Sequence, residues 1–237
     1  MRKKLISLVL FLALFYSEEI FSGSKMDSSC SNPGFFIELS ILYNQISGDF
    51  DGKSWLKRKS IEFQLPDVGE GIGLRLALGY SGSLTKKYEY SVDLNFARSS
   101  HHADWENNES DVILVKFGLD SKFYYRKNKR LQPFFELGLL LTRLYLKPHT
   151  SFLTESSADS IAQSKIVFTG VGGKSGAGVA YQLNHNLSIT AKLNYEIRSY
   201  YHVKFSRAWT PFYRGDSFGD RISGNGLMAN IGVRYSF

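Results

Sequence analysis

Charged residues occur among the alternate, polar positions of several apolar stretches in the 237-residue chain. Alternation with period 2 is typical of a β-strand with one apolar and one polar face, so these charges would share one side of a sheet. Enclosed charges must be paired, because an unpaired one carries a desolvation cost of several kcal/mol. We therefore predict a network of salt bridges, and a path for protons or ions is the alternative. The candidate residues are Glu38, Arg75, Asp93, Lys116, Asp120, Glu136, Lys192, Glu196, Arg198 and Arg234.

A second group of chemically active residues is the run from Ser99 to Asp104, which reads Ser-Ser-His-His-Ala-Asp. Serine, histidine and aspartate can act as nucleophile, general base and orienting acid, and His101, His102 and Asp104 could also hold a metal. Adjacent residues on a strand point to opposite faces, so neighbours in the sequence are poor members of a triad. We therefore predict a polar entry to a loop, no enzyme activity, no metal site and no cofactor.

Eight segments alternate over at least about nine residues, the length that a tilted strand needs to cross a bilayer. They are Gly34–Ser47, Gly69–Tyr80, Tyr88–Arg98, Asp111–Tyr125, Leu131–Lys147, Ser175–Leu183, Leu187–Tyr200 and Ser223–Phe237. Short and long connections alternate between them. In hydrocarbon every backbone polar group must be paired within the protein, so lipid-facing strands persist only as a closed cylinder. We predict an all-β fold, an eight-stranded antiparallel up-and-down transmembrane β-barrel whose side chains fill its lumen.

The N-terminus predicts export from the cytoplasm. A basic start, Met1-Arg-Lys-Lys, precedes the apolar run Leu5 to Tyr16 and the small residues Ser22 to Ser24. The predicted division is a signal peptide over residues 1–24, a short periplasmic lead over 25–33 and the barrel over 34–237. The net charge of +7 suits an anionic membrane surface, and we expect no nucleic-acid partner.

The last strand ends in an aromatic residue, with Tyr235 two positions before Phe237 and apolar residues stepping back by twos. This pattern resembles the assembly signal on the closing strand of bacterial outer-membrane barrels. Together with Pro133 to Gly138 and the hairpin Tyr181 to Leu187, it makes the chain resemble the small eight-stranded barrels of the OmpA and OmpX type. The resemblance implies a place in the bacterial outer membrane, insertion by the barrel-assembly machinery, contact with lipopolysaccharide and a monomeric state.

Tryptophan stands beside basic residues in the long connections, which this interpretation places outside the cell. Such side chains could hold lipopolysaccharide phosphates or an anionic host or matrix ligand, and an aromatic interface belt is the alternative. The candidates are Trp55, Lys57, Arg58, Lys59, Tyr145, Arg207, Trp209 and Arg214.

The predicted function is a non-enzymatic barrel that stabilises the outer membrane and presents its loops for adhesion or defence. The alternatives are a lipid A-modifying enzyme and a narrow solute channel. The segment Leu131 to Lys147 is longer than a bilayer requires, and Ile166 to Thr169 is again apolar and β-branched. We therefore expect a sheet that protrudes from the membrane, with Tyr145 to Gly170 as the principal contact surface.

Overall fold

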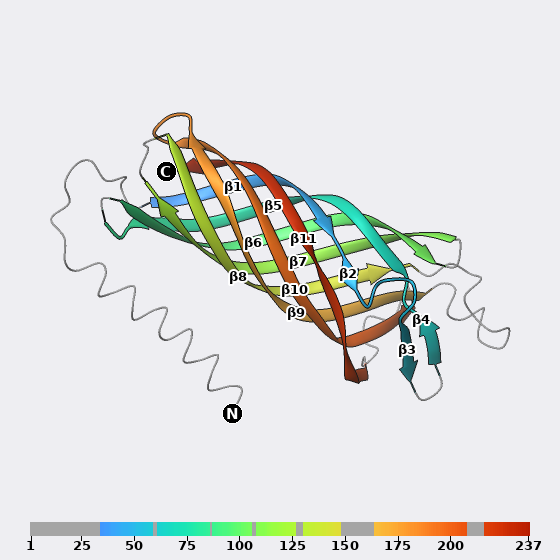
Figure 1. The fold of residues 1–237 in the computed structure, drawn as a ribbon. Coiled ribbons are helices and arrows are strands. Elements are labelled where there is room, and N and C mark those ends of the chain that lie inside the picture. Colours follow the sequence, from blue (N-terminus) through green and yellow to red (C-terminus); the bar gives the residue numbers. More distant parts are fainter. Residues whose placement is uncertain are drawn as a thin grey trace, which may run out of the picture.

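The computed structural model describes residues 34–58, 61–85, 87–105, 108–126, 130–147, 164–207 and 216–237. Eight long strands in these ranges form one antiparallel sheet that closes on itself, because the last strand pairs with the first (Figure 1). They are β1 (Gly34–Gln45), β5 (Asp67–Ser83), β6 (Tyr88–Trp105), β7 (Asn108–Tyr125), β8 (Leu131–Leu146), β9 (Ser164–Gln182), β10 (Leu187–Arg207) and β11 (Asp216–Ser236). The predicted eight-stranded up-and-down barrel is confirmed.

Three short strands lie in the connection between β1 and β5. They are β2 (Ser47–Gly48), which pairs with β11, and the hairpin of β3 (Trp55–Arg58) and β4 (Ile61–Gln64). No helix among the described residues is long and apolar enough to cross a membrane.

The outer face of the barrel is an apolar belt. One aliphatic or aromatic side chain from each strand illustrates it, with exposed fractions of 40–68%: Leu39, Leu74, Leu94, Phe117, Leu139, Val179, Leu193 and Ile231. The residues between them face inward and are buried, as Phe36, Glu38 and Ser40 on β1 show. An apolar surface that encircles the whole molecule is far larger than the patches of soluble monomers, and it matches the lipid-facing band of a membrane barrel.

The pairing of β1 with β11 closes the barrel. It runs in register from Phe36 opposite Ser236 to Asn44 opposite Met228. At its end the backbone N–H of Phe237 donates to the Phe35 carbonyl oxygen at 2.9 Å, and the Phe237 ring packs edge-on against Tyr235. The terminal strand therefore removes the free edges that a lipid environment cannot tolerate.

The two ends of the barrel differ. Short connections at residues 84–87, 126–130 and 183–186 gather at one end, close to Gly34 and Phe237, and the β3–β4 hairpin hangs from the other (Figure 1). Bacterial outer-membrane barrels have short periplasmic turns and longer external loops. The end with the short turns is accordingly the periplasmic end.

Several predicted strand boundaries were wrong, mostly at the external end. The strand predicted to begin at Ser175 begins at Ser164, the strand predicted to end at Arg98 continues to Trp105, and the one predicted to end at Tyr200 continues to Arg207. Beyond the lipid, outward positions are no longer apolar, so the alternation stops while the backbone pairing continues. In β9 the pattern is also interrupted by Gly170, Gly172 and Gly173. The connections 99–110 and 201–222 between the predicted segments are therefore partly strand.

Candidate functional site

The centre of the lumen contains a hydrogen-bonded cluster of charges around Arg75 on β5. The Nη1 atom of Arg75 lies 2.7 Å from Glu38 Oε1. Its Nη2 atom lies 2.7 Å from Asp93 Oδ1 and 2.9 Å from Asp120 Oδ2. All four residues are at most 1% exposed. One guanidinium group thus joins carboxylates from strands β1, β6 and β7.

Three lysines extend this cluster to Glu136 and complete it. Their Nζ distances are as follows: Lys122 to Glu38 Oε2 3.1 Å and to Asp93 Oδ2 3.0 Å; Lys174 to Asp120 Oδ2 2.6 Å and to Glu136 Oε1 2.9 Å; Lys192 to Glu136 Oε2 2.9 Å and to Glu38 Oε1 3.5 Å. The contacts form a closed circle through Glu38, Arg75, Asp120, Lys174, Glu136 and Lys192. We call these six residues with Asp93 and Lys122 the ion-pair ring. It has no net charge and uses seven of the eight strands.

Two members of the ion-pair ring, Lys122 and Lys174, are absent from the predicted set. Lys122 lies on the polar face of its segment, so the alternation alone could have included it. Lys174 immediately precedes the residue at which its strand was predicted to begin, and Gly172 and Gly173 hide the pattern there.

Three further predicted residues form a second cluster on the external side of the ring. Glu196 on β10 accepts from Lys116 Nζ at 3.0 Å and lies 2.7 Å from Arg198 Nη2. Arg198 also donates to Asn44 Oδ1 at 3.0 Å, which joins β10 to β1. The last predicted residue, Arg234, lies apart from both groups, near the periplasmic end.

The external part of the lumen is filled mainly by apolar side chains. Gly48 has a φ of +93°, which favours glycine, and the chain turns there so that Phe50 enters the barrel with 0% of its surface exposed. The Phe50 ring packs edge-on against Phe168 at 5.3 Å and against Tyr200 at 5.6 Å, measured between ring centroids. The members of this outer plug are Ile46, Phe50, Leu65, Val68, Ala103, Val112, Leu114, Leu144, Leu146, Ile166, Phe168, Tyr200, Val203 and Ile222.

Ser99 and His101 form a hydrogen-bonded pair inside the barrel. His101 Nδ1 lies 3.1 Å from the Gly69 carbonyl oxygen, which can only accept, so Nδ1 carries the proton. Nε2 then accepts from the Ser99 hydroxyl at 2.9 Å. A nucleophilic serine donates a hydrogen bond to its general base in the same direction. However, Ser99 and His101 are only 1% and 2% exposed.

His101 lies at the external edge of the lipid belt. Ser100 before it is paired with the outward apolar residues Ile72 and Ile113, whereas His102 after it is paired with Asp111. Burial lowers the pKa of His101 to about 4, and the positive charges of Arg198 and Lys116 act in the same direction. His102 and Asp104 are exposed on the opposite face of the strand. The structure therefore does not bring His101, His102 and Asp104 together, and no group of three such ligands occurs among the described residues.

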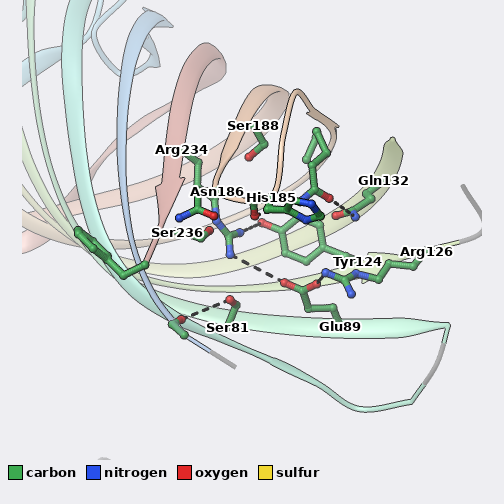
Figure 2. A pocket seen from close by; sticks show the side chains of 14 residues that line it. Ser81, Glu89, Tyr124, Arg126, Gln132, His185, Asn186, Ser188, Arg234 and Ser236 are labelled. Carbon is green, nitrogen blue, oxygen red and sulfur yellow. Dashed lines mark hydrogen bonds and ion pairs between the residues drawn. The ribbon is translucent and has the colours of Figure 1, made fainter. Parts of the chain in front are cut away.

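The periplasmic end of the lumen is a polar pocket of about 500 Å³ (Figure 2). Its lining comes from all eight strands, two turns and the residue after β11: Gly34, Ser81, Glu89, Tyr124, Arg126, Gln132, Ala180, Gln182, His185, Asn186, Ser188, Arg234, Ser236 and Phe237. Phe36 lies between this pocket and the ion-pair ring, with its ring centroid 3.8 Å from Arg234 Cζ and 5.7 Å from Lys122 Nζ. An aromatic layer of Phe36, Tyr124 and Phe134, all at most 5% exposed, separates the two.

The loop candidates are scattered over the external end. Trp55 on β3 is 54% exposed, whereas Tyr145 is half-buried on β8, opposite Ile113, and not in a loop. Lys57 and Arg58 belong to β3 and Arg207 ends β10. The remaining candidates, Lys59, Trp209 and Arg214, lie outside the described residues, as do the predicted signal peptide and periplasmic lead.

A closed antiparallel barrel with an apolar belt and a charged, side-chain-filled lumen defines a β-barrel of the bacterial outer membrane. No protein-family model matches the chain, and no curated protein matches it by sequence. Among solved structures it is similar to Neisserial surface protein A, NspA, with 14% identity over 86% of this chain and 97% of that chain and a TM-score of 0.50. It is also similar to the outer membrane protein OprG of Pseudomonas aeruginosa, with 15% identity over 89% and 99% of the two chains and a TM-score of 0.51. At these identities the likeness concerns the fold.

Replacing Arg75 with methionine tests the role of the ion-pair ring. The substitution leaves three buried carboxylates without their shared partner, so we expect a loss of about 3–5 kcal/mol in the free energy of unfolding. Urea denaturation of the refolded protein in detergent micelles measures this loss. Arg98→Met, at an exposed position on the neighbouring strand, is the control and should change stability by less than about 1 kcal/mol. Equal effects of the two variants would contradict a structural role for the ring.

His101 should make stability depend on pH. Its pKa is about 4 in the folded protein and about 6.5 when unfolded, so the unfolded state binds more protons between these values. The contribution of His101 to the free energy of unfolding is on the order of 3 kcal/mol. It is complete above about pH 6.5 and is lost as the pH falls through about 4. When the pH is lowered from about 6.5 to about 4, the free energy of unfolding measured by urea denaturation should fall less for His101→Gln than for the wild type. His185→Gln, at an exposed turn, should behave as the wild type, and identical pH profiles for all three proteins would refute the assignment.

Proposed function

We propose that the protein is a non-enzymatic outer-membrane barrel with a closed lumen, which acts in adhesion or defence through the surface that it presents outside the cell. The observation that carries the proposal is the filling of the lumen by the aromatic layer, the ion-pair ring and the outer plug in succession. Because the interior of such a barrel is filled by its own side chains, we expect its interactions to take place on its outer surfaces. Its partners would be the surrounding lipid and lipopolysaccharide, the barrel-assembly machinery and a host or matrix ligand, and it would act as a monomer.

The length of the external strands supports a role at the cell surface. On β10 the last strongly exposed aromatic residue is Tyr201, and pairing with β9 continues to Arg207 opposite Ser164. Six residues at about 3.3 Å each and a tilt near 45° correspond to about 15 Å beyond the belt. On β7, the backbone from Asn108 to Asp111 has no partner from β8, which ends at Leu146 opposite Val112. Such an edge suits the addition of a partner's strand.

The alternative of a lipid A-modifying enzyme has little support from the arrangement of Ser99 and His101. Both side chains face the lumen, away from the lipid, and both are almost fully buried. A lipid substrate would have to reach them through the barrel wall or the outer plug. Mass spectra of lipid A from cells with and without the gene should therefore be the same, and a reproducible mass difference would favour the enzyme.

The contact surface that we propose is the segment from Tyr145 to Gly170, of which residues 148–163 lie outside the described ranges. Replacing residues 148–163 with a short Gly-Ser turn leaves β8 and β9 intact and should reduce binding to host cells or matrix to background. The control is the same replacement at the periplasmic turn, residues 84–87, which should leave binding unchanged. Both variants should keep the shift between boiled and unboiled samples on SDS gels that closed barrels show. Retained binding in the external variant would reject this contact surface.

A further inference from the structure

The periplasmic pocket contains a buried guanidinium group whose hydrogen-bonding capacity is largely unused. Arg234 on β11 is 6% exposed and lies flat on the Phe36 ring, with its Cζ 3.8 Å from the ring centroid. Nη1 donates to the Tyr124 hydroxyl at 2.9 Å. Nη2 is 3.8 Å from Glu89 Oε1, which exceeds the length of a hydrogen bond. A guanidinium has five N–H donors, and no other hydrogen bond of Arg234 is present among the described residues.

The ion pairs of this pocket leave the Arg234 guanidinium without a close carboxylate partner in the described part of the chain. Among the side chains that line the pocket, Glu89 is paired with both Arg126 and Arg234, so two guanidinium groups share one carboxylate. Figure 2 shows these three side chains, from β6, β11 and the connection after β7, converging on the pocket. Arg234 itself has no carboxylate within hydrogen-bond distance among the described residues, and the fork of donors on its guanidinium group matches the two oxygens of a carboxylate.

Part of the remaining wall of the pocket consists of neutral side chains that can hydrogen-bond to amides. Gln132 Nε2 donates to Gln182 Oε1 at 3.3 Å, and Gln182 Nε2 donates to the His185 carbonyl oxygen at 3.4 Å. Both bonds are longer than the usual 2.9–3.0 Å, so these amides can turn to a ligand at low cost. Each amide offers a donor and an acceptor, as a peptide bond does. Ser188 and Ser236 add hydroxyl groups on the side of Arg234.

From these contacts we propose that the periplasmic pocket binds the carboxylate end of a short peptide. The carboxylate lies against Arg234, and the last peptide groups bond to Gln132 and Gln182. A volume of about 500 Å³ is within the range of about 300–1,000 Å³ that small-ligand sites have. The aromatic layer closes the pocket toward the ion-pair ring, so the peptide is held at the mouth and does not pass through. The barrel thereby gains a binding site on the periplasmic side, independent of its external surface.

Calorimetric titration of the refolded full-length protein in micelles tests this proposal with three probes. They are N-acetyl-alanyl-alanine, the same dipeptide with its carboxylate converted to an amide, and inorganic phosphate. The free carboxylate should bind at least about tenfold more tightly than the amide, because only the carboxylate engages the guanidinium fork. It should also bind more tightly than phosphate, because phosphate lacks the peptide groups. Equal binding of dipeptide and amide, tighter binding of phosphate, or no binding of the dipeptide would each overturn the proposal.

Two variants locate the site. Arg234→Gln removes the guanidinium and should weaken binding of the dipeptide at least about tenfold. Ser188→Asp places a negative charge on the pocket wall without altering the aromatic layer and should have a similar effect, which keeps the test decisive if the Arg234 variant fails to fold. The control is Arg221→Gln, an exposed position at the external end of the same strand, which should bind as the wild type does. Unchanged binding in a folded Arg234→Gln or Ser188→Asp protein would overturn the proposal.

Discussion

The pairing of charges inside the barrel is the interaction on which the rest of the structure depends. Lipid surrounds the middle part of every strand. A charged side chain that points inward there has no water to solvate it and must find a partner of opposite sign. Arg75 and the three lysines of the ion-pair ring satisfy four carboxylates, and the contacts bridge seven strands across the lumen. The same contacts fix the register, because a shift of one residue in any strand would turn its charge toward the lipid.

The filling of the lumen changes in character along its axis. Near the periplasm it is a polar pocket, at the centre it is ionic, and toward the exterior it is apolar where Phe50 packs on Phe168 and Tyr200. The outer plug extends outward from the external edge of the lipid belt, where strands begin to face water, so its packing there resembles the core of a soluble β-barrel. This arrangement places a packed interior between the external sheet and the periplasmic mouth, the two surfaces through which we propose that the protein acts.

The architecture could be predicted from the sequence because two constraints impose the same period-2 pattern on every strand. The lipid requires apolar side chains on the outer face, and the charges that pair in the lumen lie on the inner face. The prediction failed where one of these constraints ends. Outside the lipid, β10 continues to Arg207 with no apolar alternation to mark it, and in β9 glycine hides the position of Lys174. The outer plug was not predicted, because Phe50 lies within a polar connection and its burial depends on contacts with distant strands. The pair of Ser99 and His101, two residues apart on one strand face, could have been found from the alternation; the hydrogen bond between them could not.

The claim that the lumen is closed is tested most directly by electrical recording. The refolded protein, inserted into a planar lipid bilayer in concentrated potassium chloride, should show no steady conductance above that of the bare membrane. A trimeric porin recorded in the same apparatus verifies that open barrels are detected. A stable, reproducible ionic current through the wild-type protein would contradict the account, because ions cannot cross a lumen filled by the aromatic layer, the ion-pair ring and the outer plug.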